Sequence, residues 1–163
     1  MPALAVAHHF RNVLSGVQNM LILGSGMGST MQILAERGYT PRYTLVEADK
    51  TILQWALEFA PAGLAAHIEP VCADAEQHMA QNSATYHLIF IDIFIGRRVP
   101  SFVISLAFLR QCRAAMAPGG HLAFNYIIND EQEWQQACDA FSIVFPRHTI
   151  IDKGENRIFV TSL

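Results

Sequence analysis

Long apolar runs, paired cysteines and a surplus of positive charge are all missing from this sequence of 163 residues. No run reaches the ~18 apolar residues that a membrane-spanning helix needs. The first residues also lack the basic stretch and long apolar stretch of a secretory leader. Cys72, Cys112 and Cys138 are widely spaced without a Cys-x-x-Cys pair, which favours free thiols over disulfides or a zinc site. These absences predict a cytoplasmic protein that has no membrane partner.

Charge is scarce and slightly negative overall. Only 15% of the residues are charged and the net charge is −3, so no overall positive field is present to hold a nucleic-acid backbone. We therefore expect no nucleic-acid partner. The histidines show no metal-ligand spacing, and no metal is expected. Because 52% of the residues are hydrophobic, the composition suits one compact domain that covers residues 1–163.

Apolar periodicity and turn residues predict strands and helices that alternate along the chain. Strands are expected at 20–24, 42–47, 67–73, 86–92 and 121–127, and two further β-like runs at 143–151 and 157–162 surround a turn. Helices are expected at 3–17 (an N-terminal helix within 1–17), 28–38, 51–60, 75–81 and 101–117, with a last helix capped by Asn129 or Asp130. This alternation predicts an α/β, Rossmann-like fold: a mostly parallel seven-stranded sheet, helices on both faces and a C-terminal antiparallel hairpin.

In such a sheet the ligand lies beyond the carboxyl ends of the strands, at the switch point. The residues that follow the predicted strands are therefore the first candidates for a binding site. They are Gly24–Gly28, Glu47, Asp74, Asp92 and Asn125–Tyr126.

The segment MLILGSGMGS is typical of a buried strand that enters a tight turn and then a helix. Gly24, Gly26 and Gly28 let the main chain turn sharply and approach a ligand closely, since they have no β-carbon. Glu47 ends the second strand, where a carboxylate accepts hydrogen bonds from both hydroxyls of a ribose. Together these features predict nucleoside binding. The alternatives are an ordinary strand-to-helix turn and a solvated carboxylate.

The glycine spacing bears on which nucleoside is bound. Pyrophosphate cofactors generally use Gly-x-Gly-x-x-Gly, whereas this chain has Gly-x-Gly-x-Gly. Asp74 follows the third strand, where its carboxylate could accept a hydrogen bond from the adenine amino group. Its alternative role is the N-cap of the helix at 75–81.

The segments LILGSGMGS, LVEADKTILQWA, VCADAEQHM, YHLIFIDIF and MAPGGHLAFN resemble the class I S-adenosylmethionine-dependent methyltransferase superfamily, and within it the spermidine synthase (polyamine aminopropyltransferase) group. The resemblance covers roughly residues 18–127. It implies S-adenosylmethionine or its decarboxylated form as the cofactor, without a metal, and Asp92 as the catalytic residue. It assigns cofactor binding to Gly24, Ser25, Gly26, Gly28, Glu47, Ala48, Asp74, Ala75 and Asp92.

The sequence departs from the spermidine synthases in several places. Asp92-Ile93-Phe94-Ile95 lacks the second acidic residue that those enzymes carry three positions after the first, and Met27 stands where their glycine turn often has Asp. An N-terminal β-hairpin domain is not expected. Arg97 and Arg98 would repel a polyamine. Alternatively, they are two solvated charges, or they grip an anionic acceptor.

These departures favour methyl transfer to a small-molecule acceptor. Aminopropyl transfer in polyamine biosynthesis is the alternative. A third interpretation is a non-catalytic module that binds S-adenosylmethionine. A nicotinamide-dependent oxidoreductase is disfavoured by the glycine spacing.

His8 or His9 is a surface residue or a general base. Asn125 and Tyr126 line an acceptor pocket or satisfy hydrogen bonds at the sheet edge. Exposed apolar residues predict either a homodimer face or a lid: Phe94, Ile95 and Phe102.

Overall fold

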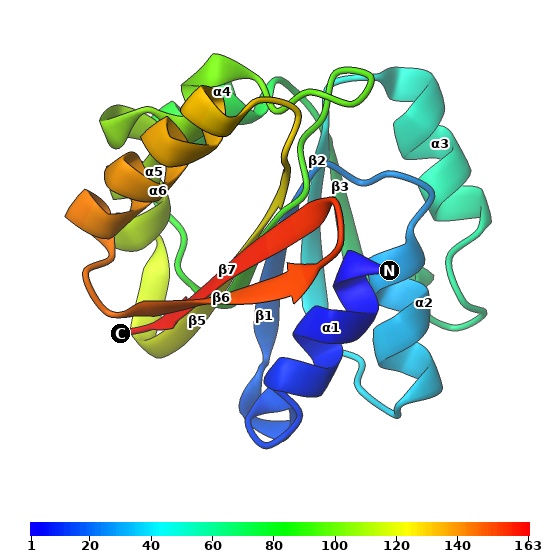
Figure 1. Cartoon of the computed structure of the whole chain (residues 1–163). Coiled ribbons are helices and arrows are strands. Elements are labelled where there is room, and N and C mark those ends of the chain that lie inside the picture. Colours follow the sequence, from blue (N-terminus) through cyan, green and yellow to red (C-terminus); the bar gives the residue numbers. More distant parts are fainter.

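Seven strands form one twisted sheet between two layers of helices in the computed structural model, which describes all residues 1–163 (Figure 1). The strand order is β3-β2-β1-β4-β5-β7-β6. The parallel strands are β1 (Asn19–Leu23), β2 (Arg42–Glu47), β3 (Ile68–Cys72), β4 (Tyr86–Ile91) and β5 (Met116–Ile127). β7 (Asn156–Ser162) runs antiparallel to both β5 and β6 (His148–Lys153). This arrangement confirms the predicted α/β class and the C-terminal hairpin.

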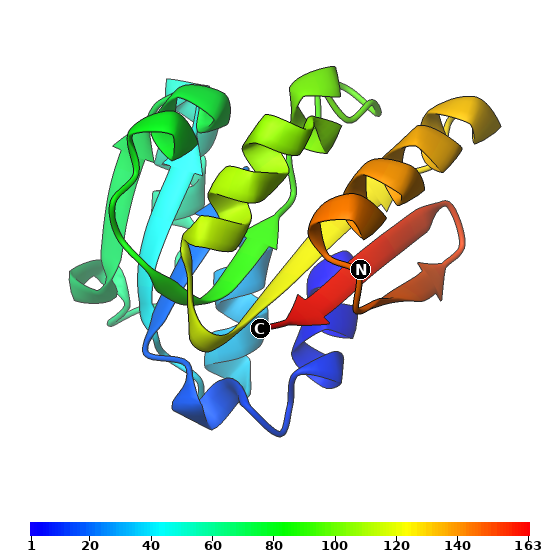
Figure 2. The same ribbon diagram turned by 90° about the vertical axis from the view of Figure 1, so that its left-hand side faces the viewer.

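The helices divide evenly between the two faces of the sheet (Figures 1 and 2). One face is covered by α1 (Pro2–His9), α2 (Ser29–Glu36) and α3 (Lys50–Glu58), and the other by α4 (Ala75–Gln81), α5 (Leu106–Ala114) and α6 (Glu131–Val144). Successive residues of a strand point to opposite faces. Leu21 therefore belongs to the core under α4–α6, and its neighbour Ile22 to the core under α1–α3. Since both faces are buried, the central strands are almost continuously apolar.

The C-terminal hairpin is fixed to the sheet by aromatic packing. Phe159 of β7 stacks on Phe141 of α6 with ring centroids 4.5 Å apart and on Phe124 of β5 at 5.6 Å. All three side chains are fully buried. This cluster sets the position of β7 relative to β5, and the candidate site described below depends on that position.

The predicted N-terminal helix is too long. α1 ends at His9, and the short 3-10 helix η1 (Leu14–Gly16) follows. Phe10 and Leu14 both point into the core, so the apolar spacing that predicted a helix reflects a buried side of the segment. The chain turns between these two residues to enter β1 at Asn19.

Two further elements differ from the prediction. The helix expected at 101–117 is divided by Ser105, whose hydroxyl oxygen accepts a hydrogen bond from the backbone N–H of Phe108 (3.2 Å) and begins α5 after the 3-10 helix η3 (Ser101–Ile104). The same predicted helix also ends early, at Ala114, because Met116 and Ala117 already belong to β5. The strand expected at 143–151 starts only at His148, because α6 continues through Val144, whose side chain is buried.

The topology places the carboxyl ends of β1, β2 and β4 at one edge of the sheet. The chain passes from β1 to β2 and β3 on one side and then crosses from β3 to β4 on the other side of β1, so the switch point is at this edge. None of the helices combines the length and the apolar character required to cross a membrane.

Candidate functional site

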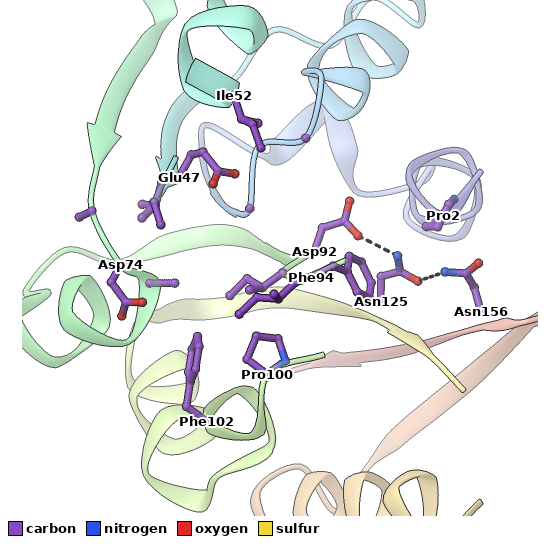
Figure 3. Close-up of a pocket in the computed structure, with 18 residues that line it drawn as sticks. Pro2, Glu47, Ile52, Asp74, Asp92, Phe94, Pro100, Phe102, Asn125 and Asn156 are labelled. Carbon is purple, nitrogen blue, oxygen red and sulfur yellow. Dashed lines mark hydrogen bonds between the residues drawn. The ribbon is translucent and has the colours of Figure 1, made fainter. Parts of the chain in front are cut away.

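A cavity of about 480 Å³ opens at the carboxyl ends of the parallel strands, at the switch point (Figure 3). Most of the residues predicted to bind the cofactor line it: Gly24, Gly26, Glu47, Ala48, Asp74, Ala75 and Asp92. Ser25 and Gly28 do not line it. The residues at the strand ends therefore mark the position of the cavity.

Two glycines of the turn are needed for close packing. Gly24 has a φ of 89°, and a β-carbon at this position would lie 2.3 Å from the carbonyl oxygen of Asp92. Gly28 is the N-cap of α2 with a φ of 76°, and a β-carbon there would lie 3.0 Å from the carbonyl oxygen of Ala56. Any larger residue at Gly24 would push the end of β1 away from the end of β4.

Glu47 is oriented by the turn that precedes α2. Its Oε2 accepts hydrogen bonds from the backbone N–H of Ser25 (3.0 Å) and from the Ser25 hydroxyl (3.2 Å), while its Oε1 accepts one from the backbone N–H of Asp49 (3.0 Å). Ser25 is buried, and its backbone N–H and hydroxyl group hold Glu47 in place. A carboxylate has about four acceptor sites, which leaves capacity for ligand hydroxyls.

Asp74 is the N-cap that the sequence allowed, and it also faces the cavity. Its Oδ1 accepts hydrogen bonds from the backbone N–H groups of Glu76 (2.9 Å) and Gln77 (3.1 Å), which makes it the N-cap of α4. Its side chain also lines the cavity. Since the cap uses only one oxygen, the other is available to a ligand. Ala48, Ile52 and Ala75 supply apolar surface nearby.

Asp92 follows β4 and faces the other end of the cavity (Figure 3). Its Oδ1 accepts a hydrogen bond from the side-chain amide of Asn125 at 2.7 Å, and the protein gives its Oδ2 no partner. Burial raises the pKa of this carboxyl above its ordinary value, and the hydrogen bond from Asn125 opposes the shift. Asp92 is thus more easily protonated than a solvated aspartate.

The sequence did not indicate two residues that line the cavity near Asp92. Pro2 enters from α1, and Asn156 enters from β7 and donates a hydrogen bond from Nδ2 to the Asn125 Oδ1 at 2.8 Å (Figure 3). Only the register of the hairpin identifies Asn156, because β7 pairs Asn125 with Ile158 and thereby places Asn156 diagonally beside it. Asn125 lines the cavity, whereas Tyr126 is buried in the core under α4–α6.

Arg97 and Arg98 are each paired with a carboxylate. Arg97 contacts Glu155 at 2.5 Å and Arg98 contacts Glu133 at 2.8 Å, and the exposed fractions of the four side chains lie between 44% and 72%. Neither arginine lines the cavity. The charge that was expected to repel a polyamine is therefore offset, and neither guanidinium is positioned to grip an anionic acceptor.

His8 and His9 are exposed at the end of α1 and lie outside the cavity, so the structure places no histidine at the site. No group of three or more His, Cys, Asp or Glu side chains is arranged to hold a metal ion. The three cysteines are free thiols. Phe94, Ile95 and Phe102 line the cavity on the side of the 93–102 loop, and Ile95 is 75% exposed.

No protein-family model and no curated protein matches this sequence. Solved structures do match the fold. Human methyltransferase-like protein 13, in complex with SAH, is 18% identical with a TM-score of 0.80, over 99% of this chain and 79% of that one. Spermidine synthase from Thermotoga maritima is 18% identical with a TM-score of 0.79, over 98% of this chain. This chain spans only 58% of that enzyme.

The O-methyltransferase TomG from Streptomyces achromogenes, in complex with SAM, is 14% identical with a TM-score of 0.72, over 98% of this chain and 78% of that one. Identities this low show a shared fold. The fold is the class I methyltransferase-like fold, which both methyltransferases and spermidine synthases adopt.

Proposed function

We propose that this chain, with its class I methyltransferase-like fold, is a transferase that binds S-adenosylmethionine and transfers the methyl group to a small acceptor. One observation carries the proposal: the cavity at the switch point holds Glu47 and Asp74 at one end and Asp92 at the other (Figure 3). The first two carboxylates suit the two polar edges of an adenosine. The third lies where the transferred group would meet its acceptor.

The end of the cavity that contains Glu47 and Asp74, called the adenosine end below, suits a flat ring that is attached to a diol. Glu47 accepts hydrogen bonds from the two ribose hydroxyls, with Ser25 and the Asp49 N–H fixing its orientation. The free oxygen of Asp74 accepts from the adenine amino group. Ile52 and Phe102 line the same cavity and provide apolar surface for the adenosine.

When bound, S-adenosylmethionine supplies an electrophilic methyl carbon next to its sulfonium. The protein then has to place a nucleophile in line with that carbon, and positioning alone supplies several kcal/mol of the barrier, up to about 7–11 kcal/mol in favourable cases. Asp92 Oδ2 receives the proton that the acceptor loses. Its raised pKa brings it closer to the strength of an effective general base near neutral pH.

The acceptor end contains a single carboxylate among apolar walls. Phe94, Ile95 and Pro100 line it, and no Lys, Arg or His side chain lines the cavity. A diamine dication requires more than one carboxylate, because each ammonium loses hydration on entry. We infer an acceptor that is mostly apolar and carries one nucleophilic N–H or O–H group.

Aminopropyl transfer from decarboxylated S-adenosylmethionine remains a second candidate for one reason. The ion pairs of Arg97 with Glu155 and of Arg98 with Glu133 offset the charge that would exclude a polyamine. Against it, Asp92 has no acidic neighbour in the cavity beyond the adenosine-binding pair.

Calorimetry tests the proposal with S-adenosylmethionine, its decarboxylated form, S-adenosylhomocysteine and NAD. We expect S-adenosylmethionine and S-adenosylhomocysteine to bind, and Glu47→Ala to weaken both by about 10- to 100-fold, the equivalent of losing hydrogen bonds to a charged group. Preference for the decarboxylated form would favour aminopropyl transfer. Binding of NAD alone, or unchanged affinity in Glu47→Ala, would overturn the proposed site. Binding without turnover in a broad acceptor screen would indicate a non-catalytic module.

A further inference from the structure

Three side chains from three separate strands form a continuous hydrogen-bonded chain at the acceptor end of the cavity. Asn156 Nδ2 donates to Asn125 Oδ1 (2.8 Å), and Asn125 Nδ2 donates to Asp92 Oδ1 (2.7 Å) (Figure 3). Asp92 follows β4, Asn125 is in β5 and Asn156 begins β7. The chain therefore runs from the transfer site to the tip of the C-terminal hairpin.

The sheet register builds this arrangement. Asn125 pairs with Ile158 across the antiparallel β5–β7 ladder, and Asn156 lies two residues before Ile158 on the same face of β7. Such diagonal neighbours are close enough for side chains to meet. Asn125 is only 2% exposed, so its amide depends on these two partners for hydrogen bonds.

A side-chain amide has a donor side and an acceptor side, and the two cannot be chosen independently. Asn156 occupies the oxygen of Asn125, and this leaves the Asn125 N–H group to face Asp92. An N–H donor suits a carboxylate oxygen that acts as an acceptor. The Asn125 N–H group binds only Oδ1 of Asp92, so that Oδ2 of Asp92 remains free to face the cavity.

We propose that Asn125 and Asn156 act as a hydrogen-bond relay that orients the Asp92 carboxylate, which makes Asn156 of the terminal hairpin a positioning residue for the transfer site. That Asp92 takes part in transfer rests on the proposed function. The hydrogen-bond relay itself does not depend on the proposed function.

The relay has a second consistent state. A protonated Asp92 that donates from Oδ1 requires the oxygen of Asn125 to face it. The Asn125 amide then turns over, and its N–H group finds an acceptor only if the Asn156 amide turns as well. Only a proton on Oδ1 reverses the two amides; a proton on Oδ2, the oxygen that faces the cavity, leaves both as they are.

Other charged groups do not replace the relay. Glu47 and Asp74 are the remaining ionisable residues of the cavity lining, and both lie at the adenosine end. The elements around Asp92 contribute Gly24 from the turn after β1, Pro2 from α1 and the two amides. The nearby loop carries Arg97 and Arg98, which are paired with Glu155 and Glu133.

The relay is tested in the ligand-free protein by following the side-chain carboxyl carbon of Asp92 by ¹³C NMR during a pH titration. Asn156→Ala should raise the pKa of Asp92, because the Asn125 amide is no longer held with its N–H toward the ionised carboxylate. Asn125→Ala should raise it further, since the direct hydrogen bond to the ionised form is lost. In the Asn125→Ala background, Asn156→Ala should have no additional effect, because its influence passes through Asn125.

Asn129→Ala is the matched control. Its side-chain amide donates to the Arg97 carbonyl oxygen (2.7 Å) at the same end of the molecule and does not contact Asp92, so the pKa of Asp92 should stay unchanged. If Asn125→Ala unfolds, Asn125→Ser replaces it, because a hydroxyl is too short to span both partners. An unchanged Asp92 pKa in Asn156→Ala, or a shift that persists without Asn125, would overturn the relay. Failure to bind S-adenosylmethionine would instead contradict the proposed function alone.

Discussion

Arg97, in the loop over the cavity, forms an ion pair with Glu155 at the tip of the C-terminal hairpin, with 2.5 Å between the guanidinium nitrogen and the carboxylate oxygen. The same loop is held at two further points, by the Arg98–Glu133 ion pair and by the Asn129 amide on the Arg97 carbonyl oxygen. Ion pairs thus connect the loop that carries Phe94 and Ile95 to the hairpin and to α6. Both ion pairs lie on the surface.

Removing these ion pairs should loosen the loop without unfolding the protein. Exposed pairs contribute only about 0–1 kcal/mol to stability, so Glu155→Gln combined with Glu133→Gln should leave the melting temperature almost unchanged. The amides of Ile95 and Arg98, which bond to each other's carbonyl groups, should exchange faster with deuterium. Asp152→Asn breaks the Arg157 ion pair on the same hairpin and is the matched control. Equal exchange rates of these amides in both variants would show that the ion pairs do not restrain the loop.

Gly24→Ala should damage both the fold and the cavity. The added β-carbon would lie 2.3 Å from the Asp92 carbonyl oxygen at a φ of 89°, and left-handed backbone strain alone costs about 1–3 kcal/mol. We expect a loss of more than about 2 kcal/mol in the free energy of unfolding, measured by urea denaturation. Gly16→Ala, where the β-carbon meets nothing within 4 Å, should be tolerated. A Gly24→Ala protein as stable as Gly16→Ala would refute the close approach.

Asp74 allows its two roles to be separated by substitution. Asp74→Ala removes the N-cap of α4 and should cost about 1 kcal/mol of stability as well as cofactor affinity. Asp74→Asn retains a capping oxygen but can present an N–H group to the ligand, so stability should persist while affinity falls. Asp49→Ala removes the corresponding cap of α3 and should lower stability alone. Calorimetry and urea denaturation on the three variants check this. Wild-type affinity in Asp74→Asn would limit Asp74 to capping.

The raised pKa of Asp92 makes stability depend on pH with a defined sign. Between the pKa of an unfolded aspartate, about 3.9, and the higher value in the fold, the folded state holds the proton more tightly. The stabilisation from the protonated form is therefore present at low pH and lost as pH rises through this window. Asp92→Asn should be more stable than the wild type at pH 7, and the difference should shrink at pH 3. Urea denaturation at both values measures it; a difference independent of pH would contradict the shift.

The position of the cavity could be predicted from the sequence because two simple regularities locate it. Parallel strands end at one edge of their sheet, and the residues just after β1, β2, β3 and β4 therefore meet there. Gly24, Glu47, Asp74 and Asp92 are local features of this kind, and all four line the cavity. Their roles in binding and transfer remain predictions.

The residues that complete the cavity near Asp92 depend on long-range pairing. Asn156 is an ordinary polar residue beside a turn until the β5–β7 register brings it to Asn125, and periodicity does not specify register in a terminal hairpin. The partners of Arg97 and Arg98 lie on other elements and could not be identified for the same reason. The early end of α1 was missed because Phe10 and Leu14 are buried at a spacing that a helix and a turn can both satisfy.

Pro2 and Asn156 line one rim although they stand near opposite ends of the sequence. A molecule held between them opposes the fraying of the first helix and the detachment of the last hairpin at the same time. Ligand affinity is then linked to cooperative opening of the entire domain, and a protease should find either terminus harder to cut once the crevice is filled.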